Sequence, residues 1–265
     1  MPASESIDLD NLAELLRIMS ILRSPDGCPW DRDQTLHTLK PFLLEEAYEV
    51  LEAIDGDDEV EHQEELGDLL FQVVFQAQIR CEQGHFNFND VSGSIVKKLL
   101  RRHPHIFGNQ TDLDREQIAD NWRRIKKEER LKKGADTSAI AGIPQKLPAL
   151  FRALRLGQKA SSVGFDWDSG KDVLGKLKEE LDEFTLAFES KDGEQMKEEF
   201  GDILFTLVNI ARHLRIDPED ALQQTNIKFD TRFRRVEKTL TDHSLRIEDQ
   251  TPDRLNQLWQ QSKST

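Results

Sequence analysis

The chain has 265 residues, 37% of them hydrophobic and 32% charged, and its formal net charge is −14 at pH 7. This charge argues against generic nucleic-acid binding, which needs a basic surface, but it permits a phosphorylated ligand if a divalent cation lies between carboxylates and phosphates. Short apolar runs, two cysteines that match no zinc motif and the lack of a secretory signal predict a cytoplasmic protein with no membrane span.

Helical patterns dominate the chain, and sustained strand-like alternation is absent from the sequence. Apolar periodicity with Gly and Pro punctuation predicts helices at 9–22, 41–54, 59–83, 89–102, 115–133, 148–160, 171–189, 192–214, 218–241 and 252–262. Residues 134–147 are rich in small residues, Gly and Pro, and form the predicted linker. We therefore predict an all-α chain with one module at 1–133 and a second at 148–265.

An internal repeat is the most informative feature of the sequence. Residues 43–54 (LLEEAYEVLEAI) align with residues 177–188 (LKEELDEFTLAF), and the same offset aligns residues 64–78 with residues 198–212. The acidic residues that coincide are Glu45, Glu46, Glu49, Glu65 and Asp68 with Glu179, Glu180, Glu183, Glu199 and Asp202. The chain therefore contains two copies of one helical module.

The repeated acids are expected to converge within each module. Positions three apart share a helix face, so Glu180 can lie beside Glu183 and Glu199 beside Asp202. The short connection at 191–193 makes the two helices antiparallel neighbours, which brings the four carboxylates together. The same spacing predicts a first-module set formed by Glu46, Glu49, Glu65 and Asp68.

Four carboxylates at close quarters repel one another unless a divalent cation binds between them. Oxygen-only ligands favour Mg²⁺, or Mn²⁺ in its place, over zinc. A single acidic run is usually a solvated face, but five acids repeated at identical spacing favour a site. Asp202 also interrupts an apolar stripe (Phe200, Ile203, Leu204 and Leu207), which we expect to face a core.

The first half of the chain contains GCPWDRDQTLHTLKPFLLEEAYEVLEAI, EELGDLLFQVVFQA and KLLRRHPHIFG, and the second half contains GFDWD, EEFGDILFTLVNIARH and KFDTRFRRVE. Through these motifs the chain closely resembles the two-domain bacterial MazG-type nucleoside triphosphate pyrophosphohydrolases, nearly from end to end. The acidic signature is shared with other all-α NTP pyrophosphatases, whereas the PWD and RRHPHIFG stretches point to this family.

The resemblance implies a homodimer whose helices pack into four-helix-bundle-like units, and Mg²⁺-dependent hydrolysis of a nucleoside triphosphate to the monophosphate and pyrophosphate. It implies that the second-module metal ligands are Glu180, Glu183, Glu199 and Asp202. It implies that the nucleotide contacts are Lys176, Lys228, Arg232 and Trp259. One departure concerns Gln195, which stands where the family can place a lysine, so that phosphate contact is in doubt.

The chemistry of these side chains agrees with such roles. Mg²⁺ can polarise phosphates and lower the pKa of water for attack at the α-phosphorus. Lys228 and Arg232 lie four apart and can neutralise the leaving pyrophosphate, or they form a solvated basic face. Trp259 can stack on a base or serve only in packing. Glu179 can orient or deprotonate the attacking water, or it can only support the groups that bind the metal.

The first module keeps its acids and also has Lys98, Arg102 and Trp122, but Phe42 stands at the position of Lys176. We therefore predict that the second module is the main catalytic site, and activity in the first stays open. The leading hypothesis is an NTP pyrophosphohydrolase with a housecleaning, nucleotide-pool or stress role, with or without a regulatory protein partner. The alternatives are a non-catalytic helical dimer that binds nucleotide or protein, and a metal-dependent phosphohydrolase for another substrate, such as dUTP or a nucleotide alarmone.

Overall fold

The structure, a computed structural model, describes residues 9–56, 58–108, 113–132, 134 and 136–263. Every regular element in these ranges is helical, which confirms the predicted all-α class. The chain divides into two compact units, residues 1–126 and residues 127–265, which are described separately below. The predicted module boundary at 133–134 falls partly outside the described residues and stays a prediction. Among the described helices, none has the length and apolar composition that a membrane span requires.

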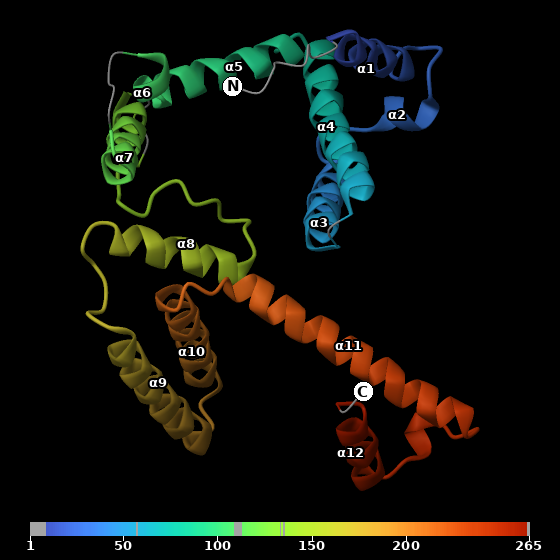
Figure 1. The fold of residues 1–265 in the computed structure, drawn as a ribbon, viewed down its shortest axis with the longest axis vertical. Coiled ribbons are helices and arrows are strands. Elements are labelled where there is room, and N and C mark those ends of the chain that lie inside the picture. The colour runs from blue at the N-terminus through green and yellow to red at the C-terminus, as the bar shows by residue number, and fades with distance from the viewer. Residues whose placement is uncertain (1–8, 57, 109–112, 133, 135, 264–265) are drawn as a thin grey trace. The chain divides into compact units, whose positions relative to one another are not determined.

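The helices of the two units follow the order in Figure 1. The first unit contains α1 (Leu9–Leu22), α2 (Pro29–Asp33), α3 (Lys40–Gly56), α4 (Glu59–Glu82), α5 (Phe88–Arg102), α6 (Pro104–Phe107) and the larger part of α7 (Arg115–Lys132). The second contains α8 (Ala149–Ser161), α9 (Gly170–Ser190), α10 (Gly193–His213), α11 (Pro218–Asp242), the 3₁₀ helix η1 (Ile247–Asp249) and α12 (Pro252–Gln261).

The predicted long helices agree with these bounds to within two residues at the described ends. The short helices α2 and α6 and η1 were not predicted, because three to five residues carry too little periodicity to detect. Aspartates begin the helices that matter for the site. Asp58, Asp192 and Asp217 each accept hydrogen bonds from the backbone N–H groups of the second and third residues of α4, α10 and α11.

Each unit contains an antiparallel helix pair, α3 with α4 and α9 with α10 (Figure 1). The connection between α9 and α10 is short, and Lys191 ends α9 in the left-handed region with φ of 57°. These pairs place the E-E-x-x-E segment of one helix beside the E-x-x-D segment of the next. Helix α8 packs against α10, and α1 packs against α4. Helix α5 leads away from the first pair to α6, and α11 leads away from the second pair to α12 (Figure 1).

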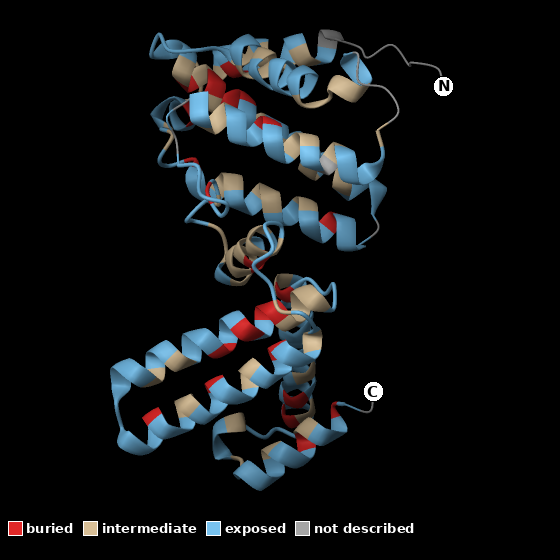
Figure 2. Ribbon diagram, turned by 90° about the vertical axis from the view of Figure 1, so that its left-hand side faces the viewer, coloured by how far each residue is buried: buried red, intermediate tan, exposed pale blue. Residues whose placement is uncertain are grey.

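Both units have small cores and wide exposed surfaces (Figure 2). The main buried cluster of the first unit is formed by Met19, Leu39, Val74, Phe75 and Ile79. In the second unit, Val236 and Leu240 of α11 pack against Leu258 of α12. The α9–α10 pair buries Val173, Ala187, Ile203 and Val208.

The apolar stripe that was expected to face a core is exposed within the chain. Phe200 is 53% exposed and Leu207 44% exposed, and Asp202 beside them is exposed as well. Only Ile203 of that stripe is buried. Periodicity in a sequence marks a face that avoids water, but it does not say whether the same chain covers it.

Candidate functional site

The second unit brings three of the predicted acids together across the α9–α10 pair. One carboxylate oxygen from each of Glu180, Glu199 and Asp202 lies within 4.8 Å of the others. Glu180 is buried at 5% exposure, Glu199 is half-buried and Asp202 is exposed. The cluster therefore has a closed side on α9 and an open side toward solvent.

Glu183 lies near this group but outside the tight triple. Burial, and then the charges of Glu183, Glu180 and Asp202, raise the pKa of Glu199 above its usual value. The repulsion predicted for clustered carboxylates is thus present, and Glu183 contributes to it.

Lys176 is the cationic side chain that contacts these acids within α9. Its Nζ lies 2.7 Å from Glu179 Oε1 and 2.9 Å from Glu180 Oε1. Hydrogen bonds to Glu179 and then to Glu180 hold the pKa of the Lys176 ammonium well above its usual value. Glu179 itself is exposed, and Asp182 on the same helix is exposed too.

The first unit has a similar cluster across α3 and α4. Oxygens of Glu46, Glu49 and Glu65 lie within 4.8 Å of one another, and Asp68 is outside this triple. Burial, followed by the charges of Asp68 and Glu49, raises the pKa of Glu46. Burial and the charge of Glu49 likewise raise the pKa of Glu65.

Gln72 is a polar contact of this cluster that sequence reasoning missed. It is buried on α4, and its Nε2 donates a hydrogen bond to Glu46 Oε1 at 3.3 Å. Its own Oε1 has no hydrogen-bond partner among the described residues. The repeat alignment carried no signal for it, because Thr206 and not a glutamine stands at the matching position of the second module.

The residue that replaces Lys176 in the first module is aromatic. Phe42 packs edge to face against Trp30, with ring centroids 5.8 Å apart. Phe42 also packs against the buried cluster of the unit. The first cluster therefore has no ammonium group at this position.

The donor set of both clusters fits a hard divalent cation. All the converging atoms are carboxylate oxygens, and burial, followed by the charges of neighbouring carboxylates, raises the pKa values of Glu46, Glu65 and Glu199. A bound cation of the Mg²⁺ type would offset the repulsion among these carboxylates.

The remaining predicted nucleotide contacts are not brought to the acids within one chain. Lys228 and Arg232 lie in α11, which runs away from the α9–α10 pair (Figure 1). Trp259 of α12 packs against Phe229 of α11, with ring centroids 5.1 Å apart. The first-module counterparts Lys98 and Arg102 lie in the part of α5 that leads away from α4 (Figure 1).

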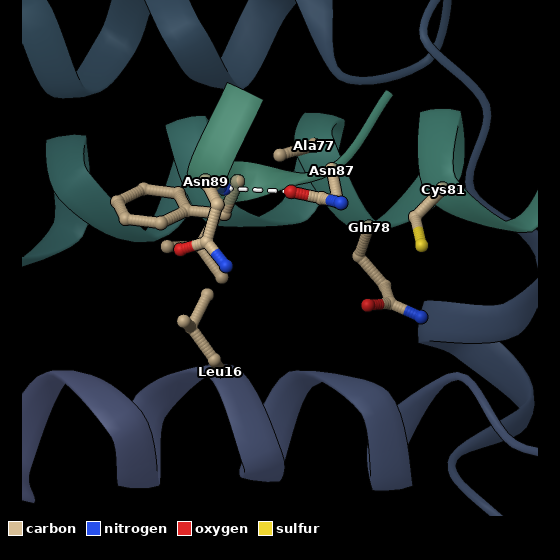
Figure 3. A pocket seen from close by; sticks show the side chains of 8 residues that line it. Leu16, Ala77, Gln78, Cys81, Asn87 and Asn89 are labelled. Atoms are coloured by element: carbon tan, nitrogen blue, oxygen red, sulfur yellow. Dashed lines mark hydrogen bonds between the residues drawn. The ribbon is translucent and has the colours of Figure 1, made fainter. Parts of the chain in front are cut away.

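A hollow in the first unit is separate from the acidic cluster. It lies between α1, the C-terminal half of α4 and the start of α5, and its lining includes Leu16, Ala77 and Gln78 (Figure 3). Asn87 Oδ1 accepts a hydrogen bond from the backbone N–H of Asn89 at 2.8 Å there, which caps α5 (Figure 3). None of the clustered acids lines this hollow, so the candidate site is the helix pair and not the hollow.

Comparison with known proteins gives the same picture of two modules. The profile of the MazG nucleotide pyrophosphohydrolase domain matches residues 34–107 and 169–236, together more than half of the chain. Each matched segment contains one of the acidic clusters. The internal duplication predicted from the sequence is therefore confirmed.

The similarity extends over almost the whole chain. An Escherichia coli K12 protein named nucleoside triphosphate pyrophosphohydrolase is 44% identical over 260 residues, which are 96% of this chain and 98% of the relative. A Thermotoga maritima protein named nucleoside triphosphate pyrophosphohydrolase/pyrophosphatase MazG is 44% identical over 250 residues, or 94% of each chain. The Bacillus subtilis protein YabN is 43% identical over 249 residues, which cover 50% of that longer protein. The chain belongs to the MazG family of nucleotide pyrophosphohydrolases.

Proposed function

We propose that the chain hydrolyses nucleoside triphosphates to nucleoside monophosphates and pyrophosphate, and that the reaction depends on Mg²⁺ or on Mn²⁺ in its place. Water attacks the α-phosphorus, the bond from that phosphorus to the bridging oxygen breaks, and pyrophosphate leaves. The observation that carries the proposal is the convergence of three carboxylate oxygens across the matching helix pair of each module. Glu46 and Glu65 correspond to Glu180 and Glu199, and the third acid is Glu49 in the first module and Asp202 in the second. The names of the Escherichia coli and Thermotoga relatives support the substrate class.

The chain's own residues have distinct roles in this proposal. In the second module Glu180, Glu183, Glu199 and Asp202 would hold the ion. When bound, Mg²⁺ supplies neutralisation of phosphate charge and acidification of water. Glu179 is exposed and directly precedes Glu180, the buried metal ligand, so Glu179 is suited to accept the proton of the attacking water. In the first module the corresponding ligands would be Glu46, Glu49, Glu65 and Asp68.

We further propose that the working form is a homodimer. Besides the exposed stripe on α10, other helices of the second unit expose large apolar side chains, namely Leu186 on α9 and Ile227 and Phe229 on α11. Exposed apolar faces of this extent favour burial against another chain. Two α9–α10 pairs would then form a four-helix bundle, and α11 would bring Lys228, Arg232 and Trp259 to the acids of the other chain.

Product analysis tests the reaction directly. The purified chain is incubated with a panel of canonical and modified nucleoside triphosphates, and the phosphate products are separated by ion-exchange chromatography. We expect pyrophosphate and the monophosphate in equal amounts, with no turnover in EDTA. Orthophosphate as the primary product would refute the proposed cleavage site. Glu180→Gln and Glu199→Gln variants that keep full activity would favour a non-catalytic role for the acidic cluster.

The same panel bears on the physiological role. We propose that the chain acts in the cytoplasm, where nucleoside triphosphates are made and used, in housecleaning or in control of the nucleotide pool. A strong preference for modified triphosphates over canonical ones would support housecleaning. A preference for dUTP or a nucleotide alarmone would indicate a phosphohydrolase with a narrower substrate range.

A further inference from the structure

We propose that Lys176 is an internal counter-cation of the second acidic cluster, that it gives up its contact with Glu180 when a metal ion binds, and that its ammonium group then contacts the phosphates of the substrate. This role, which rests on the function proposed above, couples the binding of the metal to the binding of the nucleotide. It also gives the two modules different properties.

Helix geometry places Lys176 against two carboxylates of its own helix. It lies three residues before Glu179 and four before Glu180, so the three side chains share one face of α9. The two contacts have similar lengths, 2.7 Å and 2.9 Å. The Glu179 side chain is 57% exposed, and an ion pair with so exposed a partner contributes little to the stability of the fold. Glu180 is buried, and a buried carboxylate without a counter-charge is costly, so the contact with Glu180 is the important one.

The metal and the ammonium group have to share this carboxylate. Glu180 is the buried member of the triple that includes Glu199 and Asp202. A divalent ion held by these oxygens would lie close to Nζ of Lys176, and two cations that close repel one another strongly. The long side chain of Lys176 is 36% exposed and can carry its charge toward the open side of the site. An ammonium group there is a point charge suited to a phosphate oxygen.

The first module stabilises the matching carboxylate without a charge. Phe42 occupies the position of Lys176, and Glu46 accepts a hydrogen bond from the neutral amide of Gln72 at 3.3 Å. In the second module Thr206 replaces Gln72. Each module thus supplies one hydrogen-bond donor to the equivalent carboxylate, Gln72 to Glu46 and Lys176 to Glu180. Only Lys176 is charged and competes with a cation.

The test measures metal binding apart from activity. The full-length chain carries Glu49→Gln and Glu65→Gln, so that the second module is the one that binds metal, and Mn²⁺ binding is followed by calorimetry without nucleotide. We expect Lys176→Met to bind Mn²⁺ about tenfold more tightly, because one nearby positive charge has been removed. A non-hydrolysable nucleoside triphosphate analogue added at saturating Mn²⁺ should bind about tenfold more weakly to the same variant, because a phosphate contact has been lost.

Opposite changes from one substitution are the signature of the exchange. Lys178→Met removes the same charge from an exposed position of α9 and should leave both affinities near those of the parent. Lys176→Arg keeps the charge and should restore both. Unchanged or weaker Mn²⁺ binding by Lys176→Met would overturn the proposal, since a residue that only positions Glu180 would weaken metal binding when removed.

The melting temperature gives a second measurement of the same exchange. In EDTA, Lys176→Met should melt at a lower temperature than the parent and should recover the difference when Mn²⁺ is added. If Lys176→Met does not fold, Lys176→Gln keeps a donor without the charge and carries the same expectations. A wild-type chain that releases no pyrophosphate would refute the proposed function. Normal pyrophosphate release with unchanged Mn²⁺ affinity in the variant would refute the exchange alone.

Discussion

Arg212 and Asp166 form a partly buried ion pair that fastens the loop before α9 to the C-terminal end of α10. Nη1 of Arg212 donates to Asp166 Oδ2 at 2.8 Å, and a second contact joins Nη2 to Oδ1. Nε2 of His213 lies 3.2 Å from the same carboxylate. The hydrogen bond from Arg212, with smaller contributions from Ser161 and the backbone of Trp167, holds the pKa of Asp166 well below its usual range. The GFDWD motif thus has a structural role at the base of the helix pair.

Replacement of Asp166 by asparagine should destabilise the second unit. Loss of the charged partner leaves Arg212 partly buried without its ion pair, and we expect a loss of about 1–3 kcal/mol at pH 7. Because the folded-state pKa of Asp166 lies below the unfolded value of about 4, its stabilisation is present above that pH and lost as the pH falls below it. Urea unfolding at pH 7 and at low pH measures both effects.

A matched control for this prediction is Asp168→Asn, which removes an exposed acid from the same loop. It should change the free energy of unfolding by less than about 0.5 kcal/mol. An Asp166→Asn variant as stable as wild type at pH 7 would mean that the ion pair contributes nothing to folding.

Neutralising Glu199 should stabilise the metal-free protein. Burial and four neighbouring carboxylates raise its pKa, so the folded chain holds this proton more tightly than the unfolded chain does. The stability of the metal-free protein should therefore fall as the pH rises from the unfolded value of about 4.3 through the raised folded value. In EDTA at pH 7.5, Glu199→Gln should melt at a higher temperature than wild type, and below pH 4 the difference should vanish.

Metal should reverse the order of stability of wild type and Glu199→Gln. Added Mg²⁺ should raise the melting temperature of wild type through binding to the folded state, and it should raise that of Glu199→Gln much less. The exposed Glu194, in the first turn of the same helix, offers a control substitution that should change neither result. Equal stabilisation of both proteins by Mg²⁺ would remove Glu199 from the ligand set.

The sequence predicted the long helices and the convergence of three of the four acids in each module, because both depend on local spacing. The 3.6-residue period located the long helices, and the offset of 134 positions located both carboxylate clusters. Other features depend on contacts that no local pattern carries. Asp166 and Arg212 are 46 residues apart, and Gln72 has no copy in the second module, so the repeat could not mark either contact. The prediction that the apolar stripe of α10 faces a core was wrong for a related reason, since periodicity does not say whether the same chain covers a helix face.

The two modules should differ in activity. Glu183→Gln removes a carboxylate from the cluster that also has Lys176, and we expect pyrophosphate release to fall at least about 100-fold. Glu49→Gln alters the cluster with Phe42 at the matching position, and we expect a loss of no more than about threefold, because that cluster lacks a cationic side chain for phosphate. Steady-state assays of pyrophosphate release compare the two variants with wild type. Equal partial losses of activity in Glu183→Gln and Glu49→Gln would contradict the assignment of catalysis to the second module.

Trp259 should contribute to stability through its contact with Phe229. Because the indole is half-buried between α11 and α12, Trp259→Ala should cost about 2 kcal/mol, less than the full burial of a tryptophan. Trp259→Phe keeps an aromatic contact and should lose less than about 1 kcal/mol. If the ring also stacks on the nucleobase, Trp259→Phe should raise KM while stability stays near that of wild type. Unchanged KM in a stable Trp259→Phe variant would assign the ring to packing alone.

The exposed stripe of α10 gives a direct test of the dimer. Leu207 is 44% exposed and shares a helix face with Phe200 and Leu204, so a glutamate there would place charge in the proposed interface. We expect Leu207→Glu to shift the molar mass in sedimentation equilibrium from dimer to monomer and to abolish activity, because α11 of one chain would no longer reach the acids of the other. Leu245 is also 44% exposed but lies outside α10, and Leu245→Glu should leave mass and activity unchanged. A wild-type chain that sediments as a monomer and remains active would show that one chain forms a complete site.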